Sequence, residues 1–108
     1  MLVLFDQGTP VPLARLLPEH EVRSARQQGW DTLSNGELLR VAEEAGFEVL
    51  VTTDKNIAYQ QNLKGRKIAV VVLGRNRWRL VRRAAGKIAE AVGVATPGSY
   101  VVVDVPDE

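Results

Sequence analysis

Residues 49–54 read Val-Leu-Val-Thr-Thr-Asp, an apolar, β-prone run that ends in polar side chains. A second run of this kind opens the chain, where Leu2–Phe5 is followed by Asp6. Strands that are apolar throughout are typical of parallel sheets covered on both faces. Two such strands, each followed closely by an acid, predict a sheet whose carboxyl edge carries acidic side chains.

The rest of the chain alternates between predicted helices and strands. Further strands are predicted at 21–25, 68–73 and 100–103, and helices at 35–45, 54–61 and 78–92. Another helix is predicted behind Thr9-Pro10, with Thr9 as its N-cap and an apolar stripe of Leu13, Leu16 and Leu17. The helix at 78–92 carries an apolar stripe of Leu80, Ala84, Ile88 and Val92. The helix at 35–45 begins with the capping-box pattern of Ser34 and Glu37. Alternating strands and helices predict an α/β domain, with helices on both faces of a mostly parallel sheet of about five strands.

The composition fits one globular domain that spans residues 1–108, with 45% apolar and 25% charged residues. The absence of cysteine excludes disulfides, thiolate metal sites and Cys nucleophiles, and the single histidine, His20, excludes a multi-His zinc site. The net charge of +1 steers no partner. No apolar run is long enough for a signal peptide or a membrane span, so the cytoplasm is the expected compartment.

Acidic and amide side chains gather where strands are predicted to end, and ligands of parallel sheets bind beyond those ends. Asp6 and Asp54 follow two strands, and Glu37 lies in the first turn of a helix at the same edge. Asn35 and Asn56 are expected beside them. Crowded carboxylates repel one another, and a divalent cation such as Mg²⁺ or Mn²⁺ relieves that repulsion. Such a cation polarises phosphoryl oxygens and activates water, which is the chemistry of a metal-dependent nuclease.

Three segments of the chain resemble the small bacterial PIN-like domain proteins: LFDQGTPVPL from Leu4, NGELL from Asn35 and TTDKNIAYQQNL from Thr52. The resemblance runs over nearly the whole chain and implies a three-layer α/β/α PIN-like domain. Many PIN domains are Mg²⁺- or Mn²⁺-dependent ribonucleases, and many of those are toxins of VapC-type toxin–antitoxin pairs. The resemblance therefore implies RNA as substrate, an antitoxin-like protein as partner and a homodimer as assembly.

Carried over to this sequence, the resemblance makes Asp6, Glu37 and Asp54 the catalytic acids and metal ligands. Asn35 and Asn56, the auxiliary ligands, stand where relatives often carry acids. Amides coordinate Mg²⁺ through oxygen but add no charge and no general base. Two interpretations therefore stay open: a metal-dependent ribonuclease, and a PIN-like module that binds RNA or a partner protein without cleavage. A nucleotide-binding domain would need a Gly-rich phosphate loop, which the sequence lacks.

Each candidate also has a purely structural explanation. Asp6 can end a strand in a turn, Asp54 can cap a short helix, and Glu37 can complete the capping box. Arginines clustered around an aromatic side chain could hold an RNA backbone and stack a base, or could form a solvated helix face. The members of this cluster are Arg75, Arg77, Trp78, Arg79, Arg82 and Arg83.

Overall fold

The structure is a computed structural model that describes residues 1–57, 63 and 65–107. In these residues five strands form one sheet in the order β2-β1-β3-β4-β5, and all neighbouring strands pair in parallel. The strands are β1 (Leu2–Phe5), β2 (Glu21–Ser24), β3 (Val49–Thr52), β4 (Ala69–Leu73) and β5 (Tyr100–Val103). The predicted α/β fold with a parallel sheet is confirmed.

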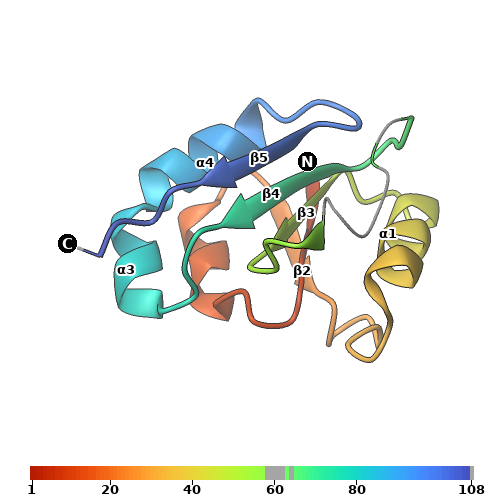
Figure 1. The fold of residues 1–108 in the computed structure, drawn as a ribbon, viewed down its shortest axis with the longest axis horizontal. Coiled ribbons are helices and arrows are strands. Elements are labelled where there is room, and N and C mark those ends of the chain that lie inside the picture. Colours follow the sequence, from red (N-terminus) through yellow and green to blue (C-terminus); the bar gives the residue numbers. More distant parts are fainter. Residues whose placement is uncertain (58–62, 64, 108) are drawn as a thin grey trace.

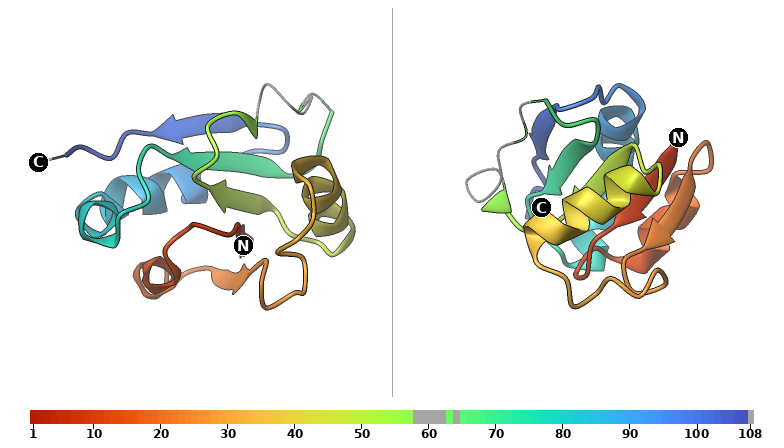
Figure 2. Two further views of the ribbon diagram at one scale, coloured as in Figure 1. Left: turned by 60° about the horizontal axis from the view of Figure 1, so that its bottom comes forward. Right: turned by 90° about the vertical axis from the view of Figure 1, so that its right-hand side faces the viewer.

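Helices lie on both faces of the sheet (Figure 1 and Figure 2). The 3-10 helix η1 (Val11–Leu16), α3 (Trp78–Arg83) and α4 (Ala85–Gly93) pack on one face, and α1 (Asn35–Glu44) packs on the other. Strand β1 contributes to both cores, because Val3 and Phe5 face η1, α3 and α4 whereas Leu4 faces α1. A strand buried on both faces has no place for a polar side chain, which explains its apolar sequence.

The region predicted as one helix over 78–92 is two helices, because the chain leaves the helical conformation at Ala84 (φ −92°, ψ 7°). The predicted apolar stripe is nevertheless continuous, since Leu80, Ala84, Ile88 and Val92 are all buried. The helix predicted at 54–61 falls mostly outside the described residues. None of the described helices is long and apolar enough to cross a membrane.

Thr9 does not cap the first helix, although the Thr9-Pro10 pattern predicts this role. Pro10 occupies the cap position, and the buried Thr9 hydroxyl donates to the backbone carbonyl of Val51 at 3.0 Å. The helix itself is a 3-10 helix, and Leu16, predicted to point inward, is 40% exposed. Thr9 therefore ties the segment behind β1 to strand β3.

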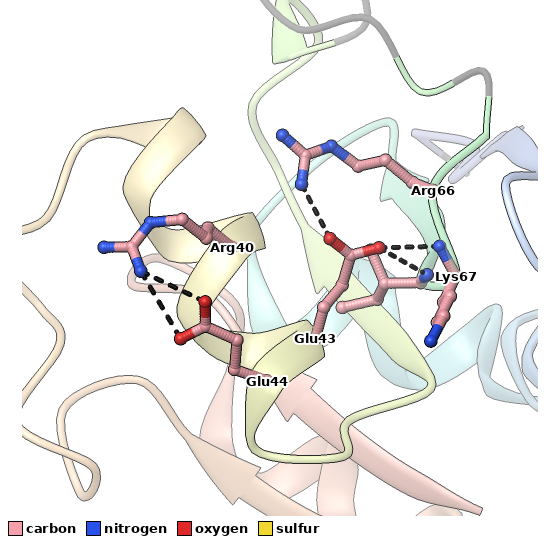
Figure 3. A network of polar contacts seen from close by, with 6 residues as sticks. Arg40, Glu43, Glu44, Arg66 and Lys67 are labelled. Atoms are coloured by element: carbon pink, nitrogen blue, oxygen red, sulfur yellow. Dashed lines mark hydrogen bonds and ion pairs between the residues drawn. The ribbon is translucent and has the colours of Figure 1, made fainter.

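Glu43, near the end of α1, connects that helix to the start of β4 (Figure 3). Its carboxylate accepts hydrogen bonds from the Arg66 guanidinium at 2.7 Å and from the backbone N–H groups of Lys67 and Ile68 at 2.6 and 3.2 Å. Burial by itself would raise the pKa of the Glu43 carboxyl. The three hydrogen bonds and the charge of Arg66 outweigh burial, so the pKa is lowered below 4.5.

We expect Glu43→Gln to lower the free energy of unfolding by about 2 kcal/mol, because the variant removes a charge that three donors share. Since the pKa of Glu43 is lowered in the folded state, its contribution is present above the unfolded-state pKa. The contribution is lost as the pH falls through the folded-state pKa. The wild type should therefore lose more stability than the variant on acidification, as urea unfolding at about pH 7 and about pH 3 will measure.

Glu44→Gln is the matched control for this prediction. Glu44 pairs with Arg40 on the same helix at 3.3 Å, and both side chains are more than half exposed. Such a surface pair contributes little, so this variant should change the free energy of unfolding by less than about 0.5 kcal/mol. Equal losses in the two variants would show that Glu43 does not hold α1 to β4.

Candidate functional site

The strand order creates a topological switch point between β1 and β3. The chain that leaves β1 runs to the η1 face, whereas the chain that leaves β3 runs to the α1 face, where Ile57 is buried. The crevice between two such diverging connections is where open parallel sheets bind ligands. Asp6 follows β1 and Asp54 follows β3 by two residues, so two of the predicted site residues lie at this switch point.

Thr52, the last residue of β3, is fully buried and connects the two aspartates. Its hydroxyl group donates to Asp6 Oδ2 at 2.8 Å. The hydroxyl oxygen of Thr52 also accepts a hydrogen bond from the backbone N–H of Asp54 at 3.1 Å. The backbone N–H of Asp6 donates to the carbonyl of Val51 at 2.9 Å, which extends the β1–β3 ladder by one residue. A single buried hydroxyl therefore contacts both of the aspartates that follow these neighbouring strands.

The other carboxylate oxygens of the aspartates also accept hydrogen bonds. Asp6 Oδ1 accepts from the backbone N–H of Gln7 at 2.7 Å, and Asp54 Oδ1 accepts from that of Asn56 at 2.9 Å. Asp54 Oδ2 accepts from the side-chain amide of Asn35, at the start of α1, at 2.9 Å. Because each carboxylate oxygen offers two lone pairs, these bonds orient the side chains and leave room for a further ligand.

Glu37 takes part in the capping box of α1, as the sequence pattern predicts. Its Oε1 accepts from the backbone N–H and the hydroxyl of Ser34 at 3.3 and 3.0 Å, and Ser34 Oγ accepts from the backbone N–H of Glu37 at 3.4 Å. Among the described residues, no group of three or more histidine, aspartate or glutamate side chains could hold a metal ion. The part of the predicted site that the fold brings together is therefore Asp6 and Asp54 with their hydrogen-bond partners.

Two open depressions flank the aspartates at the carboxyl edge. The Arg26 depression, of about 200 Å³, lies at the ends of β1 and β2, and the Arg77 depression, of about 310 Å³, lies at the ends of β3 and β4. The residues that line them include Asp6, Gln7, Thr9, Ser24 and Arg26 in the first, and Thr53, Gly74, Arg75, Asn76 and Arg77 in the second. The edge therefore offers room for a ligand on both sides of the aspartates.

The arginine cluster around Trp78 divides into residues with different surroundings. Arg75 Nε donates to the carbonyl of Val105 at 2.9 Å, and its guanidinium lies 3.7 Å from the carboxylate of Asp107. Trp78 is partly buried and packs against the core on the α3 side, which fits the structural explanation of its ring. All five arginines of the cluster are exposed: Arg75, Arg77, Arg79, Arg82 and Arg83.

Two residues at this edge, Thr52 and Arg26, were not among the site residues predicted from the sequence. Thr52 could have been found from its position, because a threonine at a strand end, two residues before an aspartate, can accept from that aspartate's N–H. Arg26 carries no such signal. Its nearness to Asp6 depends on the pairing of β2 with β1, and strand order is not encoded locally.

No protein-family model, curated protein or solved structure matches this chain. The chemistry of the edge is therefore inferred from its own residues, and the PIN-like resemblance stays an inference from three sequence segments.

We expect Thr52→Val to lower the free energy of unfolding by about 1–3 kcal/mol, because Asp6 and the Asp54 N–H lose a buried partner. Hydrogen exchange at the Asp54 amide should accelerate as well. Thr53→Val is the matched control, since the Thr53 side chain is partly exposed, and it should change stability by less than about 0.5 kcal/mol. Denaturant unfolding and exchange measured by NMR will separate the two. A Thr52 variant as stable as the Thr53 variant would contradict the linking role.

Proposed function

We propose that this chain is a three-layer α/β/α PIN-like domain that cleaves RNA with Mg²⁺ or Mn²⁺ at the carboxyl edge of its sheet. The observation that carries the proposal is the pairing of Asp6 and Asp54 through the Thr52 hydroxyl at the switch point. The resemblance of the three sequence segments supports it. The antitoxin-like partner, the homodimer and the cytoplasmic location belong to the same proposal and rest on the sequence alone.

The donor atoms at this edge suit a Mg²⁺ ion that the protein coordinates incompletely. Mg²⁺ in phosphoryl-transfer sites is commonly held by one or two carboxylates, with water and substrate phosphates in the other positions. Asp6 and Asp54 would supply the carboxylates, and Asn35 and Asn56 are the auxiliary ligands. When bound, the ion would polarise a phosphoryl oxygen and lower the pKa of the attacking water.

Glu37 is proposed as the third acid of the site. Both capping bonds to its carboxylate use Oε1, so the cap and a second role are compatible. Glu37 and Asn35 lie in the same first turn of α1, and Asn35 donates to Asp54. The turn that Ser34 caps is therefore adjacent to the aspartates, from where Glu37 would reach the site through a water molecule.

The small number of carboxylates favours a second function, in which the edge binds RNA or a partner protein without cleavage. Asn35 and Asn56 are neutral, and the Glu37 carboxylate already stabilises its own helix. A binding module would need no cation and no third acid. The two functions share the same edge and differ in whether the aspartates act on a bound phosphodiester.

The proposed ribonuclease function predicts that the purified protein cleaves single-stranded RNA when Mn²⁺ is added. Asp6→Asn and Asp54→Asn should each reduce the rate to about one hundredth or less, because each removes a charged ligand while keeping the size of the side chain. Glu19→Gln is the control, since this exposed acid precedes β2 and lies at the opposite edge of the sheet. Gel analysis of labelled RNA measures the rates. Cleavage that persists in the aspartate variants would reject this site, and no cleavage by the wild type would favour the binding module.

Two variants separate the roles of Glu37. Glu37→Gln should keep the capping box, which accepts Gln at this position, so the melting temperature should change by less than about 2 °C while cleavage falls about tenfold or more. Ser34→Ala should do the reverse, lowering the free energy of unfolding by about 1 kcal/mol and preserving cleavage. Thermal unfolding and the RNA assay test both. If Glu37→Gln cleaves at the wild-type rate, Glu37 is a capping residue and nothing more.

A further inference from the structure

The charged residues at the carboxyl edge follow the order of the strands. Arg26 follows β2, Asp6 follows β1, Asp54 follows β3, and Arg75 and Arg77 follow β4. Neighbouring strands lie about 4.8 Å apart, so the step from β2 to β4 spans roughly 14 Å. Along this line arginines lie on both sides of the two aspartates; the exposed Lys55 lies next to Asp54 in the sequence, and Asp104 follows the next strand, β5.

Each basic end of this line belongs to a depression with hydrogen-bonding groups. Arg26 lies with Ser24 and Gln7 in the Arg26 depression, and Arg77 lies with Asn76 and Thr53 in the Arg77 depression. In the described part of the chain, no carboxylate forms an ion pair with Arg26 or Arg77. Both guanidinium groups are therefore available to an anion from outside.

Arg75 differs from these two arginines because the protein orients it. Its Nε donates to the carbonyl of the buried Val105, and its contact with Asp107 is long, at 3.7 Å, with the aspartate side chain 73% exposed. The bond to Val105 fixes the guanidinium plane at the Arg77 depression, where Arg75 is a lining residue. A guanidinium held in one orientation loses less freedom when it binds a phosphate.

We propose that a single-stranded RNA crosses this edge, with phosphates bound to Arg26 in one depression and to Arg75 and Arg77 in the other. A ligand with one phosphate group can occupy one depression, whereas a strand with regularly spaced phosphates reaches both. The Gln, Ser, Thr and Asn side chains in the depressions can bind base edges that are accessible in an unpaired strand. The phosphodiester between the two depressions then lies over Asp6 and Asp54. That last placement rests on the proposed ribonuclease function, but the binding does not.

Fluorescence anisotropy with a short labelled single-stranded RNA tests the proposal, in a chelator so that no cleavage occurs. Arg26→Ala and Arg77→Ala should each weaken binding several-fold. Each should also reduce the slope of log affinity against log salt concentration by about 0.7, the value for one phosphate contact on a single strand. The double variant should lose about twice that slope. A duplex of the same sequence should bind more weakly than the single strand.

Arg40→Ala on α1 is the matched control, because it removes an exposed arginine that lines neither depression. Arg79→Ala on α3 tests the alternative that the whole arginine cluster around Trp78 binds RNA, since Arg79 also lines neither depression. Both should bind RNA as the wild type does, and unchanged melting temperatures will show that all variants are folded. Wild-type affinity in the Arg26 and Arg77 variants, or equal losses in the Arg79 variant, would overturn the proposed path. Equal affinity for the duplex and the single strand would overturn it as well.

The test also separates this path from the proposed ribonuclease function. If the arginine variants bind RNA normally while Asp6→Asn still abolishes cleavage, the ribonuclease proposal stands and the path is rejected. If binding follows the prediction and no RNA is cleaved, the path stands and the binding module is favoured.

Discussion

The parallel register between β1 and β3 is the constraint on which the candidate site depends. Val3 pairs with Val49 and Phe5 pairs with Val51, so Asp6, the first residue after β1, lies level with Thr52, the last residue of β3. A shift by one residue would turn every side chain of one strand to the opposite face and break up both cores. The apolar side chains therefore set the height of Asp6 relative to Thr52, and the hydrogen bond between them follows from the packing.

Helix α1 adds a second constraint, because polar contacts hold both of its ends. Asn35 bonds Asp54 at its beginning, and Glu43 bonds the segment that enters β4 near its end, about 12 Å away along the helix. Between them, Leu38, Leu39 and Ala42 are buried against the sheet. Apolar burial is not directional, so by itself it does not fix where along the sheet the helix lies. The two polar contacts fix that position and bring the first turn of α1 to the switch point.

Local signals in the sequence were sufficient for the strands and for the edge that carries the acids, but not for the break at Ala84 that divides the helix predicted at 78–92. Apolar runs predicted four of the strands and a weaker pattern at 21–25 predicted β2, each to within a residue, and the capping box predicted the start of α1. Each of these signals lies within a few residues. The prediction that Thr9 caps the first helix was wrong, because its hydroxyl donates to a backbone carbonyl of β3, 42 residues away. The link through Thr52 joins residues 46 apart, and the neighbourhood of Arg26 depends on strand order. These contacts are products of the assembled sheet and have no local pattern.

Although the net charge is near zero, positive and negative side chains occupy different positions along the carboxyl edge. This separation of charge relates the two proposed functions. Arginines at the outer positions attract phosphates on their own, whereas the central aspartates repel them until a cation lies between. If the cation and RNA share this edge, each raises the affinity of the other by the same factor, because binding free energies at coupled sites are reciprocal. RNA bound through the outer arginines would not depend on the cation, so the proposed binding module needs no catalytic aspartate.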